Sequence, residues 1–150
     1  MPIITGSITP HGALLDLFVR VSKNRQEKLE KLSLPIPPPV PVRAIIDTGS
    51  SVTGFHADVF TALQIQPVQS GPLLTPSTRP EDPYLAKYYD IRVVLVSGTD
   101  QYVFPPVLAI EAQSFDPTHP DRLLGLIGRD ILDRCIFDYF GPQQEFRLAF

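Results

Sequence analysis

The fold is decided by the segment Val42-Arg43-Ala44-Ile45-Ile46-Asp47-Thr48-Gly49-Ser50, which joins an apolar run to a short polar tetrapeptide. The apolar run predicts a buried strand that ends at Asp47. Gly49 allows the chain to reverse where a side chain would collide, and the reversal exposes backbone N–H groups toward the carboxylate. Thr48 adds a hydroxyl group on a stiff, β-branched side chain. The segment therefore predicts a carboxylate held in a tight turn at the end of a core strand.

A second motif, Leu126-Ile127-Gly128-Arg129-Asp130-Ile131-Leu132, follows about eighty residues later. In this order the two motifs resemble those of the retropepsin-like family of aspartic proteases, and the resemblance covers most of residues 40–150. It implies an all-β fold, a closed and bent β-barrel half-molecule with one short C-terminal helix, completed by a two-fold dimer. The chain is also about half as long as a two-lobed pepsin-like enzyme, which agrees with such a half-molecule.

The resemblance assigns roles to the residues of the tetrapeptide. It implies that Asp47 is the catalytic carboxylate and that the Thr48 hydroxyl reaches across to the active-site loop of the partner chain. Gly49 supports this loop through its turn. Ser50 is expected to hydrogen-bond the outer oxygen of the carboxylate.

The second motif is structural in this family. It implies that Ile127 and Gly128 thread behind the catalytic turn, where a side chain on Gly128 would block the close approach of two backbones. Arg129 then begins the short helix. In retropepsins this Arg pairs with an acid four residues after the catalytic Asp, a position that Ser51 occupies here. The remaining candidate partners of Arg129 are Asp58, Asp130 and a carboxyl group of the partner chain.

An acid protease uses two carboxyl groups about 3 Å apart that share one proton, so that one activates water while the other hydrogen-bonds the scissile carbonyl. The sequence contains no second Asp-Thr-Gly. Asp138 follows an apolar run, but Tyr139 lacks the turn-forming character, so Asp138 is predicted to be a surface or turn acid. We therefore expect a homodimer in which each chain donates one Asp47 across the symmetry axis.

The expected activity is that of an aspartic endopeptidase without a cofactor. A cleft lined by apolar side chains favours extended peptide or protein substrates with bulky hydrophobic residues beside the cut. The resemblance further implies limited processing of one or a few proteins, self-cleavage included.

Retropepsins close their cleft with a glycine-rich β-hairpin, the flap. The corresponding stretch here, between Leu73 and Tyr89, contains no glycine, and prolines stand at positions 76, 80 and 83. These residues predict a longer, polar tip between two flap strands. Its candidate substrate contacts are Thr75, Pro76, Ser77 and Thr78.

Length and composition limit the number of domains, the expected partners and the expected location. The 150 residues suit a single retropepsin-like domain over 1–150. A formal net charge of −3 gives no basic footprint, so neither nucleic acid nor an anionic membrane is an expected partner. No signal peptide or membrane-spanning run is recognisable, and the lone Cys135 suits a reducing compartment, so a cytoplasmic location is expected.

Seventeen prolines and little helical periodicity predict many short strands joined by rigid turns. The expected strands are Ile3–Thr9, Ala13–Val21, Val42–Asp47, Ile65–Leu74, Tyr84–Val96, Gln101–Glu111 and Phe146–Phe150. The expected helices run from Ala57 to Leu63 and from Arg129 to about Cys135. The last strand is interpreted as part of a sheet shared between two chains, or else as an ordinary edge strand.

Residues 22–41 form a charged and Pro-rich insertion or linker in this interpretation. Its charged part is expected to be a short exposed helix or a flexible loop. The proline-rich part, Pro35 to Pro41, predicts an extended, stiff spacer, and a ligand for an aromatic-lined groove is the alternative.

The three histidines, His11, His56 and His119, lack the spacing of a metal site, so no metal is expected. His56 suits a helix start, and Cys135 suits a small buried core position. A rival function remains open, because a fold does not confer activity by itself. An inactive retropepsin-like dimer could bind peptides or scaffold an assembly, which the glycine-free flap and Ser51 favour and the intact tetrapeptide opposes. A domain tethered to other proteins through the proline-rich part is a more remote alternative.

Overall fold

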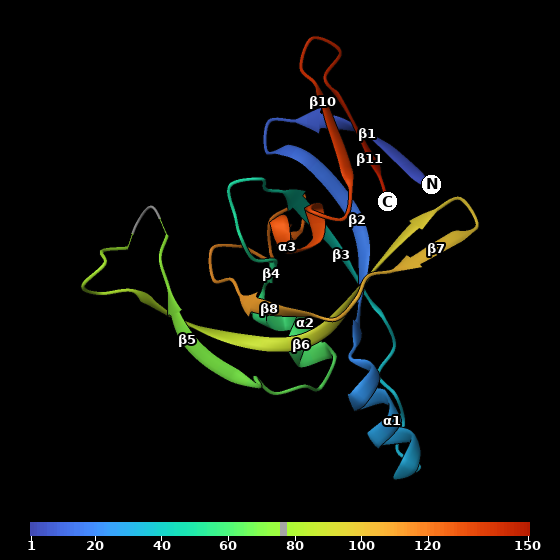
Figure 1. Ribbon diagram of the computed structural model, residues 1–150, viewed down its shortest axis with the longest axis vertical. Helices are drawn as coiled ribbons and strands as arrows, with labels where there is room; N and C mark the ends of the chain where they lie inside the picture. Colours follow the sequence, from blue (N-terminus) through green and yellow to red (C-terminus); the bar gives the residue numbers. More distant parts are fainter. Residues whose placement is uncertain (76–77) are drawn as a thin grey trace.

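The structure is a computed structural model that describes residues 1–75 and 78–150 (Figure 1). The strands are β1 Ile3–Thr9, β2 Gly12–Val21, β3 Val40–Ile46, β4 Gly54–Phe55, β5 Gln69–Leu73, β6 Tyr84–Ser97, β7 Asp100–Val103, β8 Val107–Glu111, β9 Leu123–Ile127, β10 Ile136–Phe140 and β11 Glu145–Ala149. The helices are α1 Lys23–Lys31, α2 Ala57–Ala62 and α3 Arg129–Leu132. Within the described residues, no helix has the length and apolar character needed to cross a bilayer.

A closed β-barrel forms the centre of the molecule. Its strands follow one another in the order β2, β3, β9, β4, β8 and β6, and the pairing of β6 with β2 closes the ring. Strand β9 lies between β3 and β4, parallel to the first and antiparallel to the second. The Asp47 turn follows β3 on the way to β4. Since β9 lies between these two strands, it ends directly beside the Asp47 turn. The predicted all-β barrel is confirmed.

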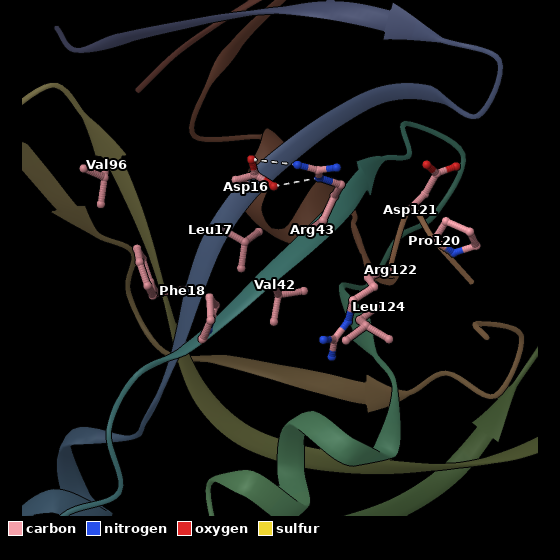
Figure 2. Close-up of a pocket in the computed structure, with 11 residues that line it drawn as sticks. Asp16, Leu17, Phe18, Val42, Arg43, Val96, Pro120, Asp121, Arg122 and Leu124 are labelled. Atoms are coloured by element: carbon pink, nitrogen blue, oxygen red, sulfur yellow. Dashed lines mark hydrogen bonds and ion pairs between the residues drawn. The ribbon is translucent and has the colours of Figure 1, made fainter. Parts of the chain in front are cut away.

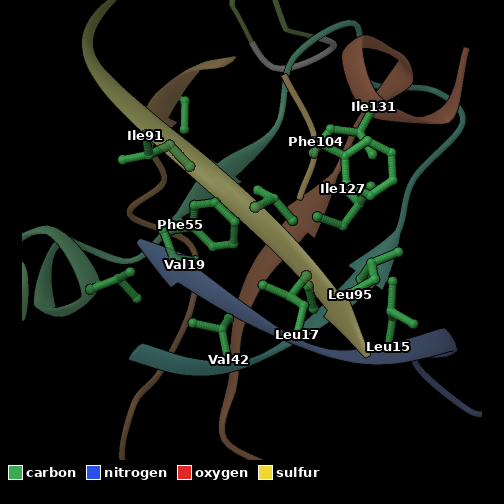
Figure 3. Packing of buried hydrophobic residues seen from close by; sticks show 14 of the residues in the cluster. Leu15, Leu17, Val19, Val42, Phe55, Ile91, Leu95, Phe104, Ile127 and Ile131 are labelled. Atoms are coloured by element: carbon green, nitrogen blue, oxygen red, sulfur yellow. The ribbon is translucent and has the colours of Figure 1, made fainter. Parts of the chain in front are cut away.

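The barrel closes around one apolar core. Along β2 the buried positions alternate, from Ala13 through Leu15, Leu17 and Val19 to Val21, as expected for a strand with one face inward. Figure 3 shows Leu15, Leu17 and Val19 in one cluster with Ile91 and Leu95 of β6 and Ile127 of β9. Each fully buried aliphatic or aromatic side chain contributes about 1.5–3 kcal/mol of transfer free energy. Burial along the strands therefore fixes the register that positions the Asp47 turn.

Helix α2 covers part of the core. Its Val59 and Phe60 are buried, and the Phe60 ring stacks on Tyr89 of β6 with centroids 3.9 Å apart. His56 caps the helix, since its Nδ1 accepts the backbone N–H of Asp58 at 3.2 Å. The helix-start interpretation of His56 is therefore confirmed.

Residues 23–31 form helix α1, which projects from the barrel at the end opposite the β10–β11 hairpin (Figure 1). The Ser22 hydroxyl caps the helix by accepting the N–H of Arg25 at 3.2 Å. Arg92 of β6 donates to the Gln26 side chain at 2.6 Å, and Leu29 is buried. Of the two alternatives for this segment, the structure has the helix. The mostly exposed residues 34–39 then lead into β3.

Most predicted strands are confirmed, with three differences. The strand expected from Gln101 to Glu111 is divided into β7 and β8, because Pro105 and Pro106 have no N–H to donate to a ladder. The strand expected from Ile65 begins only at Gln69. Strands β4, β9 and β10 had not been predicted as strands, and each is five residues long or shorter.

The C-terminal strand occupies a different position from the one expected. β11 pairs with β1 on one side, Ile3 opposite Ala149, and with β10 on the other, Ile136 opposite Ala149. Its Phe146 and Leu148 are buried in the core. Both edges of β11 are therefore occupied within the chain, so it is not an edge strand. The edge-strand alternative was wrong, because the outer position belongs to β10, and a sheet shared between two chains stays a prediction.

Candidate active site

The Asp47 side chain stands in the turn that follows β3. The Asp47 backbone N–H donates to the carbonyl of Ile127 in β9 at 2.9 Å, which extends the β3–β9 ladder by one residue. The Gly49 N–H donates to Asp47 Oδ1 at 2.9 Å, and the Ser50 N–H donates to the Asp47 carbonyl at 3.2 Å. The carboxylate is thus half-buried and oriented by the backbone of its own turn, as the tetrapeptide predicted.

Two side chains of the tetrapeptide have different surroundings. Thr48 is exposed, so its hydroxyl is accessible to a second chain. The Ser50 hydroxyl donates its proton to the Val52 carbonyl at 2.6 Å. Because a hydroxyl has one proton to donate, Ser50 does not hydrogen-bond the outer oxygen of Asp47 as expected, and instead it closes the turn after the motif.

Gly128 lies where two backbones cross. A Cβ atom at this position would lie 2.5 Å from the Val52 carbonyl oxygen and 3.0 Å from that of Ser50. The next residue, Arg129, donates its N–H to the Ser50 carbonyl at 2.9 Å. Only glycine permits this approach, by which the start of α3 holds the far side of the Asp47 turn. Ile127, directly before it, is buried in the core.

The Arg129 side chain binds backbone. Its Nη1 donates to the Thr48 carbonyl at 2.8 Å, so the guanidinium holds the tip of the Asp47 turn against α3. Neither candidate partner within the chain is used. Asp58 lies 3.5 Å from His56, and Asp130 binds Thr53. The Thr48 carbonyl oxygen therefore serves as the acceptor for Arg129, in place of the acid that retropepsins have at the position of Ser51.

Thr53 and Asp130 form a junction that sequence reasoning missed. The Asp130 carboxylate accepts the Thr53 N–H at 2.9 Å with Oδ2 and the Thr53 hydroxyl at 2.6 Å with Oδ1. The same hydroxyl oxygen accepts the Gly128 N–H at 3.1 Å. Thr53 is fully buried, so these bonds satisfy donors that water cannot reach. The sequence contains two signals for this junction: a polar Thr directly before the apolar Gly54-Phe55 pair, and an acid, Asp130, in the second motif.

A cleft of about 830 Å³ opens in front of Asp47. Asp47, Gly49 and Arg129 line it, and its apolar lining includes Leu126 and Ile110. The β5–β6 hairpin also lines it, through Leu73, Leu74, Thr75, Thr78 and Tyr84. The two sequence motifs and the expected flap hairpin therefore line one cleft.

The hairpin has the strand pairing expected of a flap, with Leu73 opposite Tyr84 and Gln69 opposite Tyr88. Near its tip, Thr78 donates its N–H to the Thr75 carbonyl at 3.0 Å, and the Thr75 N–H donates to the Thr78 hydroxyl at 2.7 Å. Pro76 and Ser77, the other two residues predicted for the tip, lie outside the described residues.

Glu111, at the end of β8, borders the cleft beside two tyrosines. The Tyr89 hydroxyl donates to Glu111 Oε2 at 3.3 Å, and the Tyr84 hydroxyl donates to the Glu111 carbonyl at 3.4 Å. Burial raises the pKa of both tyrosines, and the Glu111 charge raises each further. Both phenols therefore remain neutral hydrogen-bond donors through the physiological range.

A second hollow, of about 530 Å³, lies over β2 and β3 (Figure 2). Asp16 and Arg43 line it side by side, Arg43 Nε donates to Asp16 Oδ1 at 2.9 Å, and this hydrogen bond raises the pKa of Arg43. Both side chains are largely exposed, so the pair contributes little to stability. No residue of the Asp47 turn lines this hollow.

The other residues considered as functional candidates, Asp138, Cys135, His11 and His119, make structural contacts. Asp138 accepts from Arg147 Nε at 2.8 Å on the neighbouring strand, which confirms it as a surface acid. Cys135 is half-buried against the core, and burial raises the pKa of its thiol to about 11. His11 and His119 both approach Asp121, at 3.0 and 3.7 Å. Among the described residues, no group of three or more potential ligands could hold a metal ion.

Known proteins were compared with this chain by sequence and by structure. No protein-family model and no curated protein sequence matches the chain. A solved structure that does match is the crystal structure of a retropepsin-like aspartic protease from Rickettsia conorii. It aligns with a TM-score of 0.58 over 99% of this chain and 90% of that chain, at 14% sequence identity. The chain therefore has the fold of a retropepsin-like aspartic protease.

Proposed function

We propose that this protein is an aspartic endopeptidase whose active site is completed by a second copy of the chain. One observation carries the proposal: the Asp47 carboxylate, fixed by the Gly49 N–H at 2.9 Å, lines a cleft that a β-hairpin also lines. A carboxylate so oriented, between a backbone clamp and a substrate-sized cleft, is suited to activating water.

The chemistry needs a second carboxylate. In aspartic proteases two carboxyl groups about 3 Å apart share one proton, because two like charges at that distance cannot both persist. The ionised group removes a proton from water, which attacks the scissile carbonyl, while the protonated group donates a hydrogen bond to the carbonyl oxygen. A two-fold axis beside the turn would bring Asp47 of two chains together. The exposed Thr48 would then contact the turn of the second copy.

Supporting residues keep the carboxylate in place during the reaction. Arg129 binds the carbonyl of Thr48, and Gly128 allows α3 to lie against the turn. Ser50 closes the turn toward Val52. These contacts act on the position of Asp47, so their loss would lower the rate of the chemical step more than the affinity for substrate.

The cleft favours an extended peptide with hydrophobic side chains beside the cut. Its apolar lining includes Val52, Leu73, Leu74, Ile110 and Leu126. The hairpin that forms its wall is suited to pairing with substrate backbone, and Thr75 and Thr78 lie near its tip. Limited processing of a few proteins is the proposed role, since a small hydrophobic subsite selects sequences.

Cleavage of an unbiased peptide library, read by mass spectrometry at acidic and neutral pH, tests the assignment. The comparison is between wild type and Asp47→Asn, since the Asn side-chain oxygen can still accept the Gly49 N–H and keep the turn folded. We expect cuts by the wild type that disappear in the variant. Cuts that persist in Asp47→Asn would contradict the proposal, and a folded dimer that cuts nothing would favour a peptide-binding or scaffold function.

A further inference from the structure

Glu111 is a charged side chain of the Asp47 cleft that the proposed mechanism does not use. Among the described residues, the cleft is lined by three charged side chains, those of Asp47, Arg129 and Glu111. Asp47 is the proposed catalytic group, and the Arg129 guanidinium binds the Thr48 carbonyl at 2.8 Å. Both therefore have a role in the Asp47 turn. Glu111 is the charge of the lining that is available to a substrate.

The backbone of Glu111 is fixed by its neighbours. Glu111 is the last residue of β8 and pairs with Phe55 of β4. The next residue, Ala112, donates its N–H to the Phe55 carbonyl at 2.8 Å. The Tyr84 hydroxyl donates to the Glu111 carbonyl at 3.4 Å. A side chain carried by a paired strand keeps its position better than one carried by a loop, which a group that selects substrates requires.

The Glu111 carboxylate is largely buried, and its charge is incompletely matched. Its side chain is 14% exposed. The Tyr89 hydroxyl donates to Oε2 at 3.3 Å, a long hydrogen bond. The Lys87 Nζ lies 3.8 Å from the same oxygen, beyond hydrogen-bond distance, and the Lys87 side chain is 60% exposed, so solvent weakens the attraction.

The other carboxylate oxygen, Oε1, is the one that a ligand would reach. Within residues 1–75 and 78–150, no donor contacts Oε1 of Glu111. A carboxylate shielded from water is costly unless it is paired and hydrogen-bonded. A cation that enters the cleft would therefore stabilise Glu111, whereas a second carboxylate would be repelled by it.

We propose that Glu111 makes one subsite of the cleft select a Lys or Arg side chain of the substrate. Ile110 and Tyr84 also line the cleft, and they offer apolar surface to the stem of such a side chain while its charged end reaches the carboxylate. The ammonium or guanidinium group then donates a charge-assisted hydrogen bond to Glu111. The substrate class becomes an extended peptide with hydrophobic residues at the cut and a basic residue at a nearby position. This inference rests on the proposed function and narrows its substrates.

The first test is cleavage of the peptide library by wild type, Glu111→Gln and Glu145→Gln. Gln keeps an oxygen that accepts the Tyr89 hydroxyl, and Glu145 is an exposed acid on β11, so its variant is the matched control. We expect a position near the cut at which wild type and control prefer Lys over Met by about tenfold or more in kcat/KM. Glu111→Gln should cleave both peptides equally. Its loss on the Lys peptide should appear in KM, because the contact forms on binding.

The second test needs no cleavage. Asp47→Asn, with and without Glu111→Gln, is immobilised, the same library is passed over it, and the retained peptides are identified by mass spectrometry. We expect Lys and Arg peptides to be enriched on Asp47→Asn and not on the double variant, and thermal melts check that each protein is folded.

The two tests separate the possible failures. Cleavage without a basic preference, or a preference that persists in Glu111→Gln, would overturn the subsite and leave the proposed function intact. Glu111-dependent retention of basic peptides by a protein that cuts nothing would support the subsite and overturn the proposed function. Neither cleavage nor selective retention would overturn both.

Discussion

Asp130→Ala is expected to loosen the Asp47 turn from α3. The substitution removes both acceptors of the Thr53 N–H and hydroxyl, at 2.9 and 2.6 Å, and Thr53 has no exposed surface through which water could replace them. The Thr53 hydroxyl would also lose the partner that orients it toward the Gly128 N–H. Because this junction joins the two sequence motifs, both stability and the position of Asp47 should change.

The magnitude follows from the two buried donors. A buried donor left without an acceptor costs about 1–3 kcal/mol, so Asp130→Ala should lower the free energy of unfolding by about 3–4 kcal/mol. For a chain of this size, about 3 kcal/mol corresponds to a fall in Tm of roughly 6–12 °C. Asp130→Asn, which keeps one acceptor oxygen, should lose about half as much.

Urea denaturation followed by circular dichroism measures this effect. Asp133→Ala serves as the matched control, since it makes the same chemical change at an exposed acid immediately after α3. We expect the control to stay within about 0.5 kcal/mol of wild type. If Asp130→Ala were no less stable than Asp133→Ala, the proposed role of the Thr53–Asp130 junction would be refuted.

Two other predictions concern the same region. Gly128→Ala should destabilise the protein by about 1–3 kcal/mol in denaturant titrations, because its Cβ would meet the Val52 carbonyl at 2.5 Å, whereas Gly71→Ala, with its nearest contact at 3.9 Å, should be nearly neutral. Equal stabilities would contradict the crossing of backbones at Gly128. Alkylation of Cys135 below pH 9 should be about a hundredfold slower in the native than in the unfolded protein, and its rate should rise about tenfold per pH unit until the thiol ionises near pH 11, since burial disfavours the thiolate. A native rate equal to the unfolded rate would show that the thiol is not buried.

The sequence predicted the longer strands well, because alternation of apolar residues reports burial directly, whereas the barrel was implied by the family resemblance. β2 and β6 are long and alternate clearly, so their bounds were nearly correct. β4 is two residues long and β9 contains Gly125, and neither carries enough periodicity to be recognised. The segment of β10 stands out in the sequence only through Asp138, as a possible second catalytic motif. The inner position of β11 depends on pairing between distant segments, which a local pattern does not encode.

The candidate site was predictable to a similar extent. Asp47, Gly49 and Gly128 stand out because their roles depend on local backbone geometry, and that geometry restricts residue type. The partner of Ser50 and the two partners within the chain that were considered for Arg129 were predicted incorrectly, since each side chain finds a backbone carbonyl that no sequence pattern marks. Thr53 and Asp130 are 77 residues apart, and only the folded chain brings them together.

The central claim is that two chains each contribute one Asp47 to a single active site. Co-expression of wild type and Asp47→Asn in equal, mass-verified amounts tests it directly, with the peptide-cleavage rate per chain as the readout. If both carboxylates are required and the chains assemble at random, only wild-type homodimers cut, so about a quarter of the wild-type activity should remain. Activity that falls only to half or less steeply, or wild-type protein that cuts nothing, would contradict the account.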